Sequence, residues 1–263
     1  MKNFLLIIFI IPLVCFSVDG VILPLKSLPT SLNIKHLNQL DQYRVLSLLG
    51  DGLFQLGDNI KFNKMIASKV LWSNDGTQVE IFIKKGKFSD GTDLTIKSVY
   101  ESILECIRIS NNDATISFSK IKGYGDWIQG LKPKLEGFTW DDKTRKISIK
   151  LVSKAPSVID NFSLSTCSVM KKNKYGEFDL LNGSVGTGPY KLQSADSKII
   201  KLIKNPHHFG LFSGPENVSF KETNSSGDFH VLKKEFSLIL TDEDLAEQEG
   251  FNKYPFSRLG STQ

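Results

Sequence analysis

Histidine and cysteine are the residues of this chain best suited to hold a metal ion. The histidines are His36, His207, His208 and His230. They do not combine with cysteines or acidic residues at the spacing of a zinc site, and His207 and His208 would point apart on a strand. The sequence therefore predicts no metal site, and it predicts surface or packing roles for the histidines.

Serine and glycine motifs give no catalytic or phosphate-binding signature either. The run Gly183-Ser184-Val185-Gly186 has the wrong spacing for the Gly-x-Ser-x-Gly turn of a nucleophile. The stretch 183–188 lacks the Gly-Lys-Ser/Thr ending of a phosphate loop, so its glycines are interpreted as serving a tight backbone path. We expect no enzyme and no cofactor, and an exported hydrolase is the least favoured alternative.

Composition places the chain among ordinary globular proteins. Its 263 residues are 40% hydrophobic and 23% charged, which excludes disordered, collagen-like and disulfide-framework chains. The formal charge of +5 comes from scattered lysine pairs with acids nearby, such as Lys84 with Lys85. A nucleic-acid footprint needs a concentrated basic patch, so we expect no nucleic-acid partner.

The N-terminus has the layout of a secretory signal peptide. Lys2 is followed by an almost unbroken apolar stretch over 4–14, and then by small or polar residues around Ser17 and Gly20. As a helix this stretch would rise about 16 Å, well short of the roughly 30 Å hydrocarbon core of a bilayer. We predict that residues 1–20 form a signal peptide and that the chain is exported to the periplasm.

Export bears on the cysteines. Cys15 lies in the signal region and leaves a lipid-anchored surface protein open as an alternative, although residues 12–14 match the usual lipoprotein pattern poorly. An oxidising compartment would permit a disulfide between Cys106 and Cys167. We expect two buried free thiols, with the disulfide as the alternative.

Hydrophobic patterns predict a mixed α/β fold that would position these residues. A helix over 40–49 ends at Gly50 and Gly52, and a second helix, capped by Thr95, runs through Ile109. Turns are predicted at Asn74-Asp75-Gly76, Ser89-Asp90-Gly91-Thr92 and Asp141-Asp142-Lys143. Strands are predicted over 21–25, 79–83, 135–140, 146–151, 190–192, 199–203 and 236–240, with an acidic helix over 241–249.

Short segments of this chain occur in a recognisable order. The first is Asp51-Gly52-Leu53-Phe54; the others are 70–77, 85–95, 186–192 and 204–210. In register over roughly residues 21–250, they resemble the peptide-type (family 5) extracellular solute-binding proteins of ABC transporters. The resemblance gives a scaffold role to Asp51, Gly52, Phe88, Asp90, Gly91, Thr92, Gly186, Gly188, Pro189, Tyr190, Asn205 and Pro206.

The chain also departs from the family pattern. The usual Tyr-Trp after Asn-Pro is replaced by His208-Phe209, and Ala195 stands where an aromatic residue is expected. Family members are considerably longer, and this chain ends about where a first lobe would pass into a second. The resemblance is therefore to a divergent member whose ligand class stays open.

The resemblance implies one lobe of a clamp like that of type II periplasmic binding proteins, with the second lobe absent. Residues 21–70 and 184–263 would form a mixed-sheet domain, and 71–183 would be a smaller inserted domain. A strand returning from the far end of a longer chain would be missing, which would leave an unpaired sheet edge.

The resemblance also implies a function. The protein would bind oligopeptides or a related small solute between two lobes and deliver them to the permease subunits of an ABC importer. By alignment, Asn38, Gln39 and Leu40 would contact the ligand, and Ser165, Thr166 and Cys167 would lie near the cleft. The competing interpretation of these residues is ordinary loop and core packing. The competing function is a truncated or repurposed single lobe that acts as an interaction or sensory module.

Overall fold

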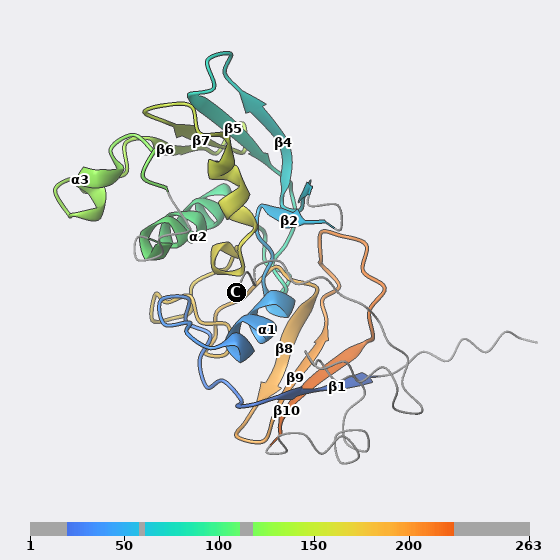
Figure 1. Ribbon diagram of the computed structural model, residues 1–263. Helices are drawn as coiled ribbons and strands as arrows, with labels where there is room; N and C mark the ends of the chain where they lie inside the picture. The colour runs from blue at the N-terminus through green and yellow to red at the C-terminus, as the bar shows by residue number, and fades with distance from the viewer. Residues whose placement is uncertain (1–19, 58–60, 111–117, 224–263) are drawn as a thin grey trace, which may run out of the picture.

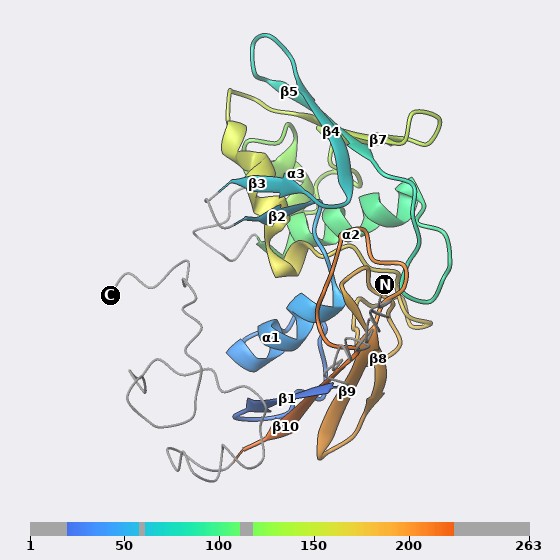
Figure 2. The same cartoon turned by 90° about the vertical axis from the view of Figure 1, so that its right-hand side faces the viewer.

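A computed structural model describes residues 20–57, 61–110 and 118–223 (Figure 1). Residues 1–19 of the expected signal peptide, including Cys15, lie outside the described residues, as do the strand expected over 236–240 and the acidic helix over 241–249. Two four-stranded sheets lie at opposite ends of the described molecule, with helices α1 (Leu40–Leu49) and α2 (Ile96–Ile109) between them (Figure 1, Figure 2).

The first sheet is mixed and packs against α1. Its strands, in the order β1-β10-β9-β8, are β1 (Gly20–Leu25), β10 (Asn217–Glu222), β9 (Ile199–Lys204) and β8 (Tyr190–Ala195). Strand β1 runs parallel to β10, and the other neighbours are antiparallel. The inward residues Leu202 and Phe220 are buried together with Val45 and Leu46 of α1, so one face of the sheet forms a core with that helix.

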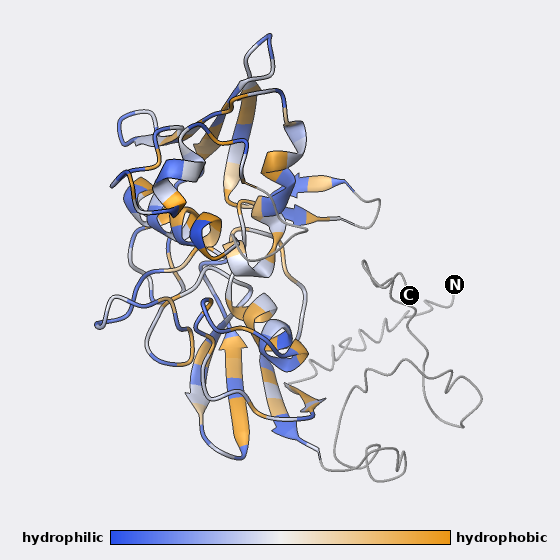
Figure 3. Cartoon of the chain, turned by 60° about the vertical axis from the view of Figure 1, so that its left-hand side comes forward, coloured by the Kyte–Doolittle hydropathy of each residue, from blue (hydrophilic) through white to orange (hydrophobic). Residues whose placement is uncertain are grey.

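The second sheet is antiparallel and packs against α2. Its strands, in the order β4-β5-β7-β6, are β4 (Ala67–Trp72), β5 (Gln78–Ile83), β7 (Lys146–Lys150) and β6 (Phe138–Asp141). Burial alternates along β5, and Figure 3 shows hydrophobic and hydrophilic residues mixed within the sheets. On the solvent side Glu80 and Lys146 form an ion pair, whereas Ile81 and Ile147 face the core.

Local sequence signals account for the main helix and turns. Thr95 caps α2, because its Oγ1 accepts a hydrogen bond from the Ser98 N–H at 3.1 Å. Helix α1 begins with reciprocal hydrogen bonds between Gln39 and Gln42. The predicted turns before β5 and α2 are confirmed, with glycine at φ +68° (Gly76) and +84° (Gly91).

Helices α1 and α2 have the predicted bounds, but several strands do not. The strand expected from residue 135 begins only at Phe138, and the strand expected over 190–192 continues to Ala195. Sequence patterns also missed elements that are short or lie between turns. These are β2 (Phe54–Leu56), β3 (Phe62–Lys64), α3 (Tyr124–Ile128), and the 3-10 helices η2 (Pro156–Ser163) and η3 (Ser165–Cys167). The longer strands β4 and β10 were missed as well.

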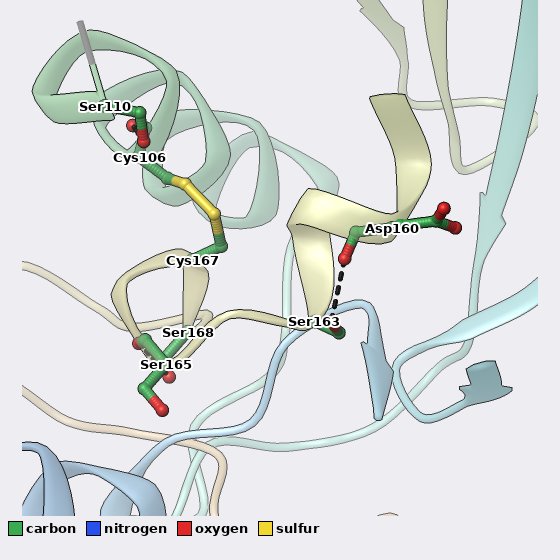
Figure 4. Close-up of a disulfide and its surroundings, with 7 residues drawn as sticks. All are labelled: Cys106, Ser110, Asp160, Ser163, Ser165, Cys167 and Ser168. Atoms are coloured by element: carbon green, nitrogen blue, oxygen red, sulfur yellow. Dashed lines mark hydrogen bonds between the residues drawn. A yellow bond between two sulfur atoms is a disulfide. The ribbon is translucent and has the colours of Figure 1, made fainter. Parts of the chain in front are cut away.

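The expectation of two free thiols is wrong, because Cys106 of α2 and Cys167 of η3 form a disulfide (Figure 4). Both residues are fully buried, and their Cα atoms lie 4.9 Å apart. Helix α2 packs against η3, and this packing brings together two cysteines that are 61 positions apart in sequence.

The buried residues form two cores. Those between Leu53 and Val169 gather around α2 and the second sheet. Those up to Leu49, and again from Met170 onward, gather around α1 and the first sheet. The predicted domains, 21–70 with 184–263 and the inserted 71–183, have boundaries that differ from those of the two cores. This domain division stays a prediction.

Candidate functional site

Four of the five motif segments that carry the family resemblance converge where the two cores meet. The Ser89 N–H donates to the Gly186 carbonyl at 2.9 Å, which joins the turn before α2 to the glycine motif. The Asn205 side-chain amide donates to the Gly188 carbonyl at 2.7 Å. His208 reaches Asp51, so the 51–54 segment joins the same junction.

The two glycines of the 186–188 segment permit a close crossing over the end of α1. A Cβ on Gly186 would lie 2.0 Å from the Leu49 carbonyl oxygen, and a Cβ on Gly188 would lie 2.5 Å from the Gly50 nitrogen. Neither residue has a positive φ. The glycines are therefore needed for backbone approach, as the sequence predicted.

Thr187, between these glycines, ties three segments together. Its side chain is fully buried, accepts a hydrogen bond from the Asp51 N–H at 3.2 Å and donates to the Val169 carbonyl at 3.0 Å. In the sequence, Asp51 comes just before Leu53, the first buried residue of the core around the second sheet, and Val169 is the last. Thr187 thus ties the 186–188 segment to the two points, Asp51 and Val169, at which the chain enters and leaves the core of the second sheet.

Asp51 and His208 form a largely buried pair beside Thr187. The Asp51 Oδ2 lies 2.8 Å from His208 Nε2, and the side chains are 12% and 9% exposed. His208 Nδ1 lies 3.1 Å from the Gly210 carbonyl oxygen. Both ring nitrogens of His208 are therefore engaged in polar contacts with the protein.

Asp90 is held by an ion pair on the other side of the junction. Lys171 Nζ lies 2.5 Å from Asp90 Oδ2, and Thr92 donates to Asp90 Oδ1 through both its N–H and its hydroxyl. Burial acts to raise the pKa of Asp90, but the hydrogen bonds from Lys171 and Thr92 outweigh burial and hold this pKa below its ordinary value. Asp90 is therefore engaged in contacts within the protein, and its scaffold role stays a prediction.

An open cavity of about 360 Å³ lies next to this junction. Its wall is shared by the end of α1, the Ser89-Asp90 turn, the 183–186 loop and strand β8. Sequence patterns gave no sign of it, because its lining comes from four segments that are far apart in the chain. Volumes of this size fall within the range of small-ligand pockets.

Asn38, Gln39 and Leu40 lie together at the start of α1 and are exposed. The Asn38 and Gln39 N–H groups donate to Gln42 Oε1 at 2.9 and 3.1 Å. Leu40 is 59% exposed, so it presents an apolar side chain at the surface. These contacts fix the backbone of the segment while leaving Leu40 accessible.

A buried carboxylate anchors the loop that leads to this segment. Asp179 is 4% exposed, and it accepts hydrogen bonds from the Leu32 N–H and the Asn182 side chain, both at 2.8 Å, and from the Ser31 hydroxyl. The approach to Asn38 is thereby tied to a segment about 140 residues later in the chain.

Ser165, Thr166 and Cys167 form η3, beyond the opposite end of α1. Ser168 packs on Gly50 at that end, and a ten-residue helix rises about 15 Å, so the structure does not bring η3 together with Asn38–Leu40. Ser165 and Thr166 are partly exposed, whereas Cys167 is fully buried in the disulfide (Figure 4). The thiol of Cys167 is therefore not available to a ligand.

Two further properties concern the described residues alone. Within 20–57, 61–110 and 118–223, no group of three or more His, Cys, Asp or Glu side chains is arranged to hold a metal ion. Among the helices in the same residues, none has the length and apolar character needed to cross a membrane.

Comparison with known families identifies the chain. Residues 61–226 match the family described as "Bacterial extracellular solute-binding proteins, family 5 Middle". The chain belongs to this family. The match covers the second sheet, the disulfide and three of the four converging motif segments, so the resemblance seen in the sequence is confirmed.

Solved structures of this family's fold superimpose on the protein. The pheromone receptor PrgZ has a TM-score of 0.68 at 19% identity, over 82% of this chain and 45% of its own. Listeria monocytogenes OppA bound to peptide has a TM-score of 0.65 at 18% identity, over 82% and 45%. A Borrelia burgdorferi oligopeptide-binding protein has a TM-score of 0.66 at 19% identity, over 84% and 46%.

At these identities the similarity shows the fold, which is that of one lobe of a family 5 binding protein. The chain spans about 45% of the length of these structures. No curated protein matches the sequence.

Proposed function

We propose that this protein binds oligopeptides as the substrate-binding component of an ABC importer, without catalysis, and that it is exported to the periplasm. Membership of family 5 over residues 61–226 carries the proposal. The fold supports it, because Listeria monocytogenes OppA, which has the same fold, was solved bound to peptide. The predicted signal peptide supports export.

Peptide recognition of this kind uses backbone chemistry. Every peptide presents the same N–H and C=O groups, so pairing with extended protein segments gives affinity, and roomy wet pockets tolerate varied side chains. The Asn38–Leu40 segment suits such contact, since its backbone is fixed by Gln42 and the Leu40 side chain is accessible. Ser165 and Thr166 would line the same cleft in a complete clamp.

Delivery to a permease follows from the physics of a clamp. Closure of two lobes around a ligand buries it and creates a surface that differs from the open form. The permease subunits are proposed to recognise that surface. A ligand that binds the native state alone stabilises it by about 2.7 kcal/mol when its concentration is 100 times Kd.

Thermal unfolding tests the proposal. A pool of random tri- to pentapeptides is expected to raise Tm of the full chain, whereas free amino acids and monosaccharides are not. Leu40→Ala is expected to reduce the shift without lowering the Tm of the free protein, since Leu40 is exposed. Leu131→Ala, at a residue 67% exposed, is the matched control and should leave the shift unchanged. A shift with another solute class and none with peptides would rule out the peptide assignment.

A further inference from the structure

The outer edge of β8 carries backbone groups that pair with nothing in the sheet. The Asn205 N–H donates to the Pro189 carbonyl at 2.8 Å, which makes these two residues a hydrogen-bonded pair. Pairs alternate along antiparallel strands, so Lys191 also bonds across to β9, while the N–H and C=O groups of Tyr190 and Leu192 point away from it.

Pairing on the other side of β9 gives the same register. The Lys204 N–H donates to the Glu216 carbonyl at 2.9 Å, so Lys204 bonds toward β10 and not toward its β8 neighbour Tyr190. Strand β8 is the last strand of this sheet in the described residues. Within those residues, no turn or loop hydrogen bond reaches the backbone of Tyr190 or Leu192.

This edge faces the cavity described above. Tyr190, Lys191 and Leu192 line it, and so do Leu49 and Leu180. Tyr190 is only 1% exposed, and its hydroxyl is anchored on the Pro215 carbonyl at 2.8 Å. Buried backbone groups are nearly always hydrogen-bonded, and strands pair about 4.8 Å apart, so an added strand would satisfy the groups that face the cavity.

Charge at the rim favours an acidic partner. Asp90 lines the cavity, but it is already paired with Lys171. Lys191 has no ion pair within the described residues, and it lies on the face of β8 opposite Leu192. The side chains of an added strand would alternate in the same way, so apolar residues would meet Leu192 and Leu180, and acidic residues would meet Lys191.

We propose that the β8 edge binds an extended peptide of alternating apolar and acidic residues by β-strand addition. This site differs from the proposed ligand segments, because neither Asn38–Leu40 nor Ser165–Cys167 lines the cavity. The backbone of Tyr190 and Leu192 gives affinity, and Lys191 selects the charge of the partner.

The test uses the full chain and a fluorescein-labelled peptide, Glu-Val-Glu-Val-Glu-Val, with binding followed by anisotropy. Leu192→Pro removes an outward N–H without removing a bond to β9, and proline is tolerated at such edge positions. Its affinity is expected to fall at least about tenfold. Leu211→Pro, at a fully exposed loop residue, is the matched control and should bind like the unaltered protein.

A second variant does not depend on backbone tolerance. Lys191→Glu should weaken Glu-Val-Glu-Val-Glu-Val and strengthen binding of Lys-Val-Lys-Val-Lys-Val. Circular dichroism and Tm confirm that each variant is folded. The inference would be overturned if the unaltered protein did not bind the peptide. It would also be overturned if Leu192→Pro and Lys191→Glu bound it with the affinity of the unaltered protein. A random-peptide pool that still raises Tm in these variants would leave the proposed function standing while the edge site fails.

Discussion

Asp51 Oδ2 contacts His208 Nε2 at 2.8 Å, although 157 positions separate the two residues. The side chains are 12% exposed for Asp51 and 9% exposed for His208. This contact therefore joins two of the motif segments at the point where they converge.

Loss of one partner of this pair should be costly. His208→Ala leaves the Asp51 carboxylate largely buried and without this hydrogen-bond partner, and a buried polar group that loses its partner costs about 1–3 kcal/mol. His207→Ala, at the adjacent residue, should cost less than about 1 kcal/mol. Urea unfolding measures both values. In a double-mutant cycle with Asp51→Ala, a coupling energy near zero would show that the contact contributes nothing to stability.

Gly186 should not tolerate a side chain. Gly186→Ala would place Cβ 2.0 Å from the Leu49 carbonyl oxygen, and relief requires the 186–188 segment to move off α1. We expect a loss of about 3 kcal/mol in urea unfolding. Gly125→Ala is the control, because a Cβ there meets nothing within 4 Å. It should be neutral or stabilise by about 0.5–1 kcal/mol. Equal stability of the two variants would contradict the close crossing.

The disulfide should contribute strongly to stability. Cys106 and Cys167 are 61 positions apart, and closing a loop of that size lowers the entropy of the unfolded chain by an amount equivalent to about 4 kcal/mol. The double variant Cys106→Ala, Cys167→Ala should unfold at correspondingly lower urea. Dithiothreitol should destabilise the unaltered protein and leave the double variant unaffected. A thiol titration that finds both cysteines free in the native protein would contradict the pairing.

Asp90 gives a pH dependence with a defined sign. Its pKa is lowered in the folded state, so the unfolded chain binds the proton more tightly. The ion pair with Lys171 therefore stabilises the fold above the ordinary pKa of 3.8, and this stabilisation is lost as the pH falls through the lower folded value. Asp90→Asn should cost about 0.5–1 kcal/mol at pH 7, and the difference from the unaltered protein should shrink below pH 4. A difference that is constant with pH would contradict the assignment.

Periodic and turn signals in the sequence predicted the two long helices and several of the strands. The spacing of Val99 and Ile103, with the Thr95 cap, predicted α2, and the alternation around Ile147 predicted β7. Hairpin β2–β3 was missed, because its strands have three residues each and the second is exposed throughout. Three-residue strands offer too few positions for alternation to be recognised.

Contacts between segments that are far apart in the chain could not be predicted from local sequence patterns. Whether Cys106 and Cys167 pair depends on the packing of α2 against η3, and no local pattern encodes that distance. Likewise, the glycines of the 186–188 segment predicted a tight backbone path, but not that the path crosses Leu49. The motif segments predicted a family, while the ligand residues Asn38–Leu40 and Ser165–Cys167 stay predictions.

Equilibrium dialysis of the full chain against a random pentapeptide pool tests peptide binding most directly. We expect peptides of varied sequence to accumulate on the protein side, and we expect unlabelled peptides, but not sugars or free amino acids, to displace them. Equal peptide concentrations on both sides, together with retention of another solute class, would contradict this expectation.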